Sequence, residues 1–128
     1  MPDYMLLLYA NEADEAEAAR RWEELPQWRA ITDELRAAGV LVANDALHQP
    51  SSATTLRVRD GETTLTDGPF AVTKEILAGY YVLRCADLDA ALGHAARLPM
   101  ARYGAIEVRP IMTAADIPDR SGTVADAA

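Results

Sequence analysis

Short apolar runs alternate along the chain with segments in which apolar residues recur at helical spacing. Residues 4–9 and residues 80–83 are apolar at every position, which is typical of strands that are buried on both faces. Residues 40–43 form a further apolar run and predict another strand. We therefore expect the runs at residues 4–9 and 80–83 to lie in the interior of one sheet.

Two segments predict long helices. The first begins at Pro26, because proline is favoured in the first turn, and ends at residue 38 before Gly39, a typical helix stop. Its predicted buried stripe comprises Leu25, Trp28, Ile31, Thr32 and Leu35. The second follows Asp87, which can cap it, and ends at Pro99. Its predicted inward stripe comprises Leu88, Ala91, Leu92 and Ala95. Residues 11–21 place acids before arginines and predict a shorter, solvated helix.

Alternating patterns predict a hairpin and a last strand. Residues 54–59 alternate with period two, Asp60-Gly61 is typical of a tight turn, and residues 63–66 return as the partner strand. Residues 106–110 place Ile106 and Val108 on one face and Glu107 and Arg109 on the other.

The turn Asp67-Gly68-Pro69-Phe70 separates the hairpin from the second apolar run. Proline fixes φ and removes a donor, so this stretch is neither helix nor central strand. We expect Gly68 to adopt a positive φ and Asp67 to bond the backbone of the turn, with a role as general base as the alternative. Phe70 is the only phenylalanine, and we expect it to fill the core.

The predicted order of elements is β-α-β, a hairpin, then β-α-β. This order indicates an α+β protein with a ferredoxin-like sheet and both long helices on one face. The other face needs a cover, because the runs at 4–9 and 80–83 are apolar on both sides. A second copy would supply it, giving a homodimer, a dimeric α/β barrel with a cavity between the sheets. Residues 1–112 are predicted to form a single domain, and 113–128 a flexible tail.

Composition narrows the function classes. The chain has 128 residues with 20 acidic and 12 basic side chains, and its net charge of −8 argues against nucleic acid or an anionic membrane as a partner. Cys85 is the single cysteine, so no internal disulfide is possible. No apolar run approaches the roughly 18 residues of a membrane span, and no secretory signal is recognisable. We expect a soluble, cytoplasmic protein.

Several motifs occur together in order. They are Asp67-Gly68-Pro69-Phe70, Thr73-Lys74-Glu75, Gly79-Tyr80-Tyr81, Glu107-Val108-Arg109-Pro110 and the segment at residues 35–41. Over about residues 4–111 the chain thus resembles the DGPF subgroup of the YCII-related family. The resemblance implies a dimeric α+β barrel. Some members look like small cofactor-free enzymes, and DGPF members are often encoded near alternative sigma factors.

The chain departs from the family pattern at two places. The broader family has a histidine on the first long helix that is proposed to work with a downstream aspartate. Alignment on Pro26 and Gly39 places Trp28 and Ala37 at these positions, so that dyad is absent. Val72 stands where many DGPF members carry glutamate, which removes an acidic group from the central motif.

Candidate chemistry is expected around the open sheet face and the central loop. The candidates for proton transfer are Glu75, His48, Tyr80, Tyr81 and Asp67. The candidates for ligand contact are Lys74, Arg109, Glu107 and Phe70. Each has a structural alternative: Lys74 and Glu75 can bridge to the last strand, Glu107 and Arg109 can form an intersubunit ion pair, and a tyrosine can simply pack.

The remaining reactive residues predict no site of their own. His48 and His94 lack the partners that a metal site needs, and we expect no metal and no cofactor. His94 is predicted to be partly exposed on the second helix. Cys85 is predicted to be a small buried hydrophobe.

Three function classes stay open. The first is a dimer that binds a small polar or aromatic molecule in its inter-sheet cavity, as a regulatory accessory. The second is a cofactor-free lyase, isomerase or dehydrohalogenase that uses acid–base residues of the same cavity. The third is a protein-interaction module that docks a basic partner through the acidic segment beginning at Glu12.

Overall fold

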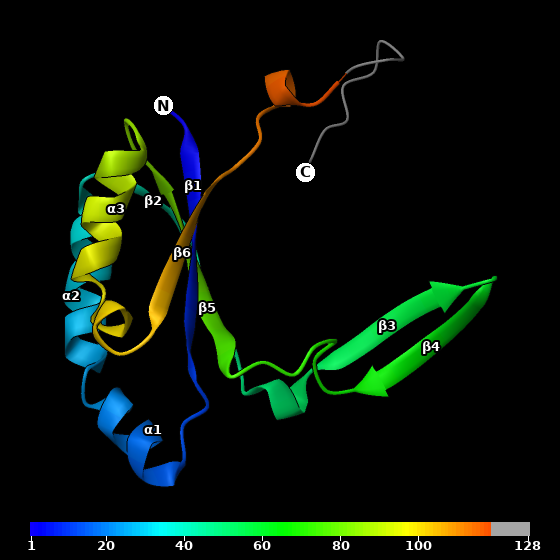
Figure 1. Ribbon diagram of the computed structural model, residues 1–128. Helices are drawn as coiled ribbons and strands as arrows, with labels where there is room; N and C mark the ends of the chain where they lie inside the picture. Colours follow the sequence, from blue (N-terminus) through cyan, green and yellow to red (C-terminus); the bar gives the residue numbers. More distant parts are fainter. Residues whose placement is uncertain (119–128) are drawn as a thin grey trace.

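The computed structural model describes residues 1–118 and shows an open four-stranded antiparallel sheet (Figure 1). β1 (Asp3–Asn11) lies between β5 (Glu75–Arg84) and β6 (Ala105–Pro110), and β2 (Leu41–Ala46) pairs with the other side of β5. The resulting order, β2-β5-β1-β6, confirms the predicted ferredoxin-like α+β fold. The described chain does not close into a barrel by itself.

The helices lie on one side of the sheet. α2 (Leu25–Ala37) and α3 (Leu88–Arg97) cover one face, and α1 (Glu15–Trp22) lies at one end (Figure 1). Asp14 and Asp87 cap α1 and α3, accepting backbone hydrogen bonds of 2.8 and 2.9 Å, and the cap at Asp87 confirms its prediction. Gly39 follows α2 with a φ of 73°, which ends that helix.

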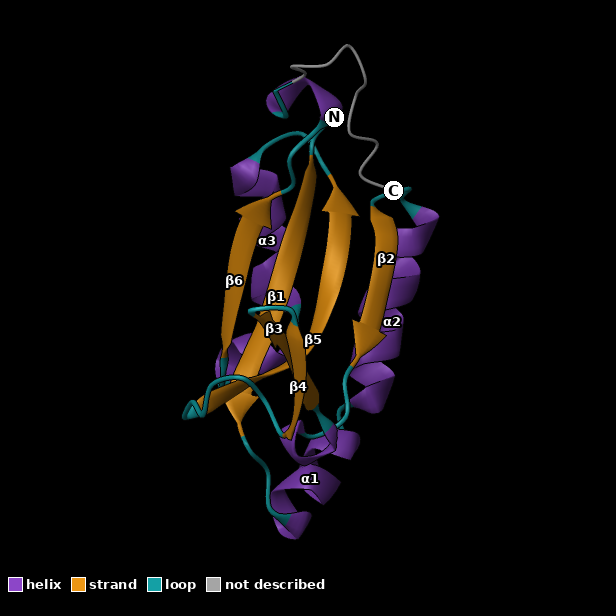
Figure 2. Ribbon diagram, turned by 90° about the vertical axis from the view of Figure 1, so that its right-hand side faces the viewer, coloured by secondary structure: helices purple, strands orange, loops and turns teal. Residues whose placement is uncertain are grey.

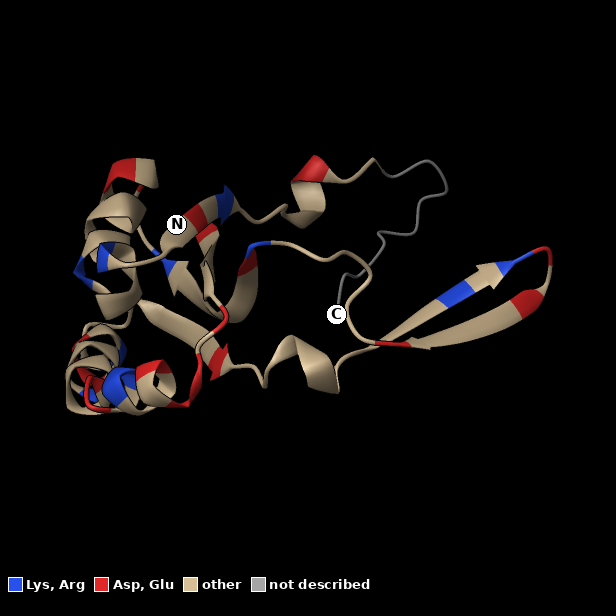
Figure 3. Ribbon diagram, turned by 60° about the horizontal axis from the view of Figure 1, so that its bottom comes forward, with Lys and Arg blue, Asp and Glu red and all other residues tan. Residues whose placement is uncertain are grey.

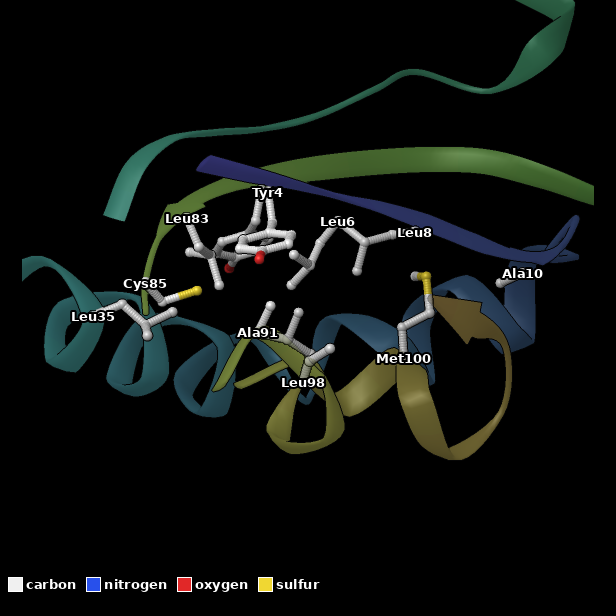
Figure 4. Close-up of a cluster of buried hydrophobic side chains, with 12 residues drawn as sticks. Tyr4, Leu6, Leu8, Ala10, Leu35, Leu83, Cys85, Ala91, Leu98 and Met100 are labelled. Atoms are coloured by element: carbon white, nitrogen blue, oxygen red, sulfur yellow. The ribbon is translucent and has the colours of Figure 1, made fainter. Parts of the chain in front are cut away.

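The core lies between the sheet and the helices (Figure 4). Alternate residues of β1 point into it, because successive strand side chains face opposite sides; they are Tyr4, Leu6, Leu8 and Ala10. From α3 only Ala91 and Ala95 are buried, whereas Leu88 and Leu92 are 47% and 46% exposed. The predicted inward stripe of this helix was therefore half wrong, because its small residues form the contact with the sheet.

The hairpin is a separate two-stranded sheet that projects from the main body (Figures 1 and 2). It consists of β3 (Thr54–Arg59) and β4 (Glu62–Asp67), and we call it the arm. The predicted turn is present at Asp60 and Gly61, with φ angles of 51° and 78°. Two consecutive positive φ values are typical of the type I′ turn, which matches the twist of a hairpin.

The turn after the arm confirms one prediction and corrects two others. Gly68 has the predicted positive φ, 98°. The bonds that hold the turn come from the Gly68 N–H to the Ala53 carbonyl, 2.7 Å, and from the Thr55 hydroxyl to the Gly68 carbonyl, 2.8 Å, rather than from Asp67. Phe70 is 80% exposed, so its prediction as a core residue was wrong. The loop that carries it starts at the arm, which lies away from the core.

Short 3₁₀ segments complete the described chain: Pro50–Ser52, Pro99–Arg102 and Ala114–Asp116. The last of these lies in the segment predicted as a tail, and residues 119–128 of that tail lie outside the described residues. Among residues 1–118, no helix has both the length and the apolar character needed to cross a bilayer.

Candidate functional site

The open face of the sheet, opposite the helices, carries part of the predicted site. Met5, Leu7 and Tyr9 point to this face and are half-buried. Tyr80 and Glu107 flank Leu7 in register, and Arg109 lies beside Met5. The face thus combines an apolar centre with charged groups on the β6 edge, as the alternation in residues 106–110 predicted.

The structure does not bring the predicted charged residues together within one chain. Glu75 pairs with Asn11 at one end of β1, whereas Arg109 pairs with Met5 near the other end. Six residues of strand separate the two positions, which corresponds to about 20 Å. Within residues 1–118, neither these two residues nor Lys74 or Glu107 form an ion pair. Their joint ligand role therefore stays a prediction that needs a second chain.

Three further candidates lie at the base of the arm. Asp67 ends β4, Phe70 lies in the loop after it, and His48 lies in the segment that leads from β2 to the arm. All three are exposed. This placement gives them access to a binding partner but no enclosed pocket of their own.

The two consecutive tyrosines face opposite sides of the sheet. Tyr80 lies on the open face, where its hydroxyl donates a 3.0 Å hydrogen bond to Oδ2 of Asp45. This hydrogen bond, and then the negative charge of Asp45, raise the pKa of Tyr80 above its ordinary value. Tyr81 lies on the helix side and is 4% exposed. The sequence predicted that one of the pair faces the open side, and the structure shows that it is Tyr80.

A cavity of about 460 Å³ lies on the helix side, between α1, α2 and the β2–β5 edge of the sheet. Apolar and aromatic groups form most of its wall, including Leu8, Trp22, Leu25, Trp28, Ala78, Tyr81, Met100 and Tyr103. Gly79 also lines it and lets β2 approach closely, since a Cβ there would lie 2.7 Å from the Asp45 carbonyl oxygen. Tyr81 is the predicted site residue that lines this cavity.

Two aromatic rings form one wall of the cavity. The rings of Trp28 and Tyr81 stack with an interplanar angle of 17° and their centroids 6.3 Å apart. The Tyr81 hydroxyl shares a 2.7 Å hydrogen bond with the Thr32 hydroxyl, one helical turn after Trp28. This bond fixes the Tyr81 ring against α2, and the Trp28 ring of the same helix packs on it.

Most charged groups that line the cavity have partners. Arg36 pairs with Asp33 at 2.9 Å, and Asp45 accepts from Tyr80. Arg21 pairs with Glu17 at 3.1 Å, and its guanidinium lies 4.9 Å from the centre of the Tyr103 ring. Arg29 lines the cavity and has no ion pair within residues 1–118. Among the arginines that line the cavity, Arg29 is thus the one without an acidic partner in the described chain, and Asp45 keeps its negative charge beside the neutral Tyr80 hydroxyl.

Tyr103 is the second tyrosine that lines the cavity. Burial, and then the nearby charge of Glu24, raise the pKa of Tyr103, so its hydroxyl stays protonated at neutral pH. It can therefore donate a hydrogen bond but cannot serve as a ready base. Within the described part of the chain, no group of three or more His, Cys, Asp or Glu side chains is placed to hold a metal ion.

Sequence reasoning missed this cavity, although it predicted Trp28 on the buried stripe of the helix that covers it. The sequence signal that could have indicated the cavity was the pair Trp28 and Thr32 on the inward stripe of α2, together with the two tyrosines of β5. That signal did not reveal an open space, because the space depends on where α1 and β2 end. Cys85 is buried as predicted, and His94 is half-buried.

The geometry defines a small α+β protein with a ferredoxin-like sheet and an apolar cavity under its first long helix. The chain matches the YCII-related domain over residues 3–115. It is also 38% identical over 112 residues to an uncharacterised protein from Rhizobium meliloti (strain 1021), an alignment that covers 84% of this chain and 90% of that protein. The chain belongs to the YCII-related family. Its place in the DGPF subgroup stays a prediction.

Proposed function

We propose that the protein binds a small, flat, largely apolar molecule with an acidic group in the cavity between α2 and the sheet. The observation that carries this proposal is the stacked wall of Trp28 and Tyr81. The volume, about 460 Å³, falls in the range of roughly 300–1,000 Å³ that is usual for small-molecule sites.

The wall favours a flat ligand because its rings are fixed before binding. Tyr81 is nearly fully buried and hydrogen-bonded to Thr32, and Trp28 stacks on it. A flat ring can stack on the half-buried Trp28, which Tyr81 supports from the core side, and an aromatic pair contributes about 0.5–1.5 kcal/mol beyond its buried area.

The charge favours an acidic group. Arg29 lines the cavity without an ion pair in the described chain, and a guanidinium binds a carboxylate through two parallel hydrogen bonds. Of the acids that line the cavity, Asp33 pairs with Arg36, and the Asp45 carboxylate is hydrogen-bonded to Tyr80 on the open face of the sheet. Arg29 is therefore the group of the cavity wall with which a ligand carboxylate would pair.

The same geometry favours binding over turnover. The cavity wall contains no histidine, and the family's dyad positions hold Trp28 and Ala37. An indole and a methyl group transfer no proton at neutral pH. The acid–base candidates Glu75 and His48 do not line this cavity. A binding protein is thus better supported than a lyase or isomerase.

We further propose that two copies pair through the open faces of their sheets. The support is the half-buried apolar row of Met5, Leu7 and Tyr9, extended by Tyr80 and Val82 of β5. This pairing would give the dimeric barrel and the inter-sheet space in which Glu107 and Arg109 lie. The ligand cavity on the helix side does not depend on it.

The test of ligand binding uses 2-naphthoate and its uncharged analogue 2-naphthylmethanol in calorimetric titrations. We expect saturable binding of naphthoate, at least tenfold weaker binding of the alcohol, and loss of this preference in Arg29→Gln. The chain has two tryptophans, Trp22 and Trp28, and both line the cavity, so their indole N–H resonances should shift on binding.

A filled cavity supplies the matched control. Ala78→Leu adds bulk inside the cavity and should abolish binding, whereas Ala30→Leu on the exposed face of α2 should leave it unchanged. Circular dichroism melting should show that both variants stay folded. Undiminished binding by a folded Ala78→Leu variant would refute the proposal. A wild-type protein that binds neither naphthoate nor the alcohol would refute it as well.

A further inference from the structure

The arm has no packing partner within the described chain. β3 and β4 pair only with each other, and every residue of the two strands except Thr55 is exposed. An isolated two-stranded hairpin is marginally stable in water, because it has no covered face. An arm of this length therefore indicates a surface that another body covers.

The two faces of the arm differ in chemistry. The register places Leu56 directly opposite Leu65 and puts Val58 on the same face, and these three side chains are 60%, 65% and 52% exposed. The other face pairs Arg57 with Thr64 and Arg59 with Glu62. The charged residues are visible toward the tip of the arm in Figure 3. The arm is thus amphipathic, although its apolar face meets only solvent.

The loop after the arm adds two exposed apolar side chains. Phe70 and Val72 are 80% and 97% exposed. Together with the three apolar side chains of the arm they expose on the order of 600 Å², at the upper end of the ~300–600 Å² that the largest apolar patch of a monomer usually covers. This area approaches the ~800 Å² that each partner buries in a standard protein interface.

The direction of the arm indicates what covers it. Figures 1 and 2 show that the arm extends from the side of the sheet that carries no helix. The half-buried apolar row of Met5, Leu7 and Tyr9 lies on this same side. One body seated on the open face would therefore lie beside the arm and could cover both surfaces. A second copy in two-fold symmetry offers each chain the same pair of surfaces, and the assembly then closes.

We infer that the arm clasps a second copy of this chain, with the apolar face of Leu56, Val58 and Leu65 buried against the partner. This inference rests on the proposed pairing of the open faces and extends it. The arm then acts as an intermolecular strap, and the exposed Phe70 belongs to the interface rather than to the core.

The test compares the two faces of the arm by light scattering across a concentration series. Wild type should have twice the chain mass of 13.9 kDa. The variant Leu56→Thr/Val58→Thr/Leu65→Thr keeps side chains that favour strands but removes the apolar face, and its dimer dissociation constant should rise at least tenfold. The control Arg57→Thr/Thr64→Val changes a directly opposed pair on the other face and should keep the wild-type constant.

A second measurement reports the contact directly. A photoreactive benzoylphenylalanine at position 65 should cross-link two chains, whereas the same group at the neighbouring position 64 should not, since it points to the other face. A monomeric wild type, an unchanged dissociation constant in the triple variant, or equal cross-linking from both positions would overturn the inference. Leu7→Asp separates the two proposals: if it dissociates the dimer and the triple variant does not, the open faces pair without the arm.

Discussion

The hydrogen bond between Tyr81 and Thr32 connects β5 to α2 at the wall of the cavity and gives the sharpest test of the geometry. The two hydroxyl oxygens lie 2.7 Å apart. Tyr81→Phe removes one of them and leaves the half-buried Thr32 hydroxyl without its protein partner. Since water reaches a half-buried hydroxyl, we expect a loss of about 1 kcal/mol in the free energy of unfolding, near the usual net value of one hydrogen bond.

The reverse change should cost more. Thr32→Val keeps the β-branched shape but leaves the hydroxyl of Tyr81, a residue only 4% exposed, without a partner. An unsatisfied buried hydroxyl costs about 1–3 kcal/mol, so we expect a value near the middle of that range. In the double variant neither hydroxyl is left alone. The double variant should therefore lose less than the sum of the single losses, by about 1 kcal/mol.

The measurement is urea unfolding followed by circular dichroism for wild type, both single variants and the double variant. Thr66→Val, on the exposed arm, is the control and should change the unfolding free energy by less than about 0.5 kcal/mol. Additive losses, with a coupling below about 0.3 kcal/mol, would show that the two hydroxyls do not interact in solution. The fixed aromatic wall would then lose its support.

Three further changes test other parts of the fold. Gly104→Ala should lower the free energy of unfolding by at least about 2 kcal/mol, because the added Cβ would overlap the Tyr9 carbonyl oxygen. Gly93→Ala, which has open space around it in α3, should raise the free energy of unfolding by about 0.5–1 kcal/mol. Equal effects of the two changes in thermal unfolding would contradict the close approach at residue 104. Phe70→Ala should change the unfolding free energy of the dilute monomer by less than about 0.5 kcal/mol, and a loss of about 3–5 kcal/mol would restore its prediction as a core residue. Burial, and then the charge of Asp87, raise the pKa of the Cys85 thiol above its ordinary value, so the stabilisation of its protonated form is present at neutral pH and is lost as the pH rises through the raised pKa. Native protein should accordingly react with a thiol reagent at pH 8 far more slowly than the denatured chain, and equal rates would contradict this burial.

The elements and their order could be predicted because local signals agree with the tertiary structure. The alternation in residues 106–110 and the continuous apolar run at 4–9 correspond to an edge strand and a central strand. The predicted cap at Asp87 acts on a backbone group three residues away, so the local sequence is enough to indicate it.

The wrong burial predictions share one cause, which is that burial depends on how the elements pack in three dimensions. Phe70 was expected inside because it is large and apolar, yet its burial depends on the direction of the preceding arm, which no local signal specifies. Leu88 and Leu92 lie on the predicted inward side of α3, but the alanines of that helix make the contact and leave the leucines at its border. Composition identified the apolar residues correctly and could not tell which of them meet the sheet.

The cavity was beyond sequence reasoning for a related physical reason. An empty space is a property of several elements at once: α1 ends at Trp22, β2 approaches β5 at Gly79, and Tyr81 is held toward Trp28 by Thr32. Each of these positions has an ordinary structural explanation by itself. Their combination places both tryptophans of the chain, and an arginine that has no ion pair within residues 1–118, around one apolar space. This aromatic wall supports the proposed recognition of a flat ligand over acid–base catalysis.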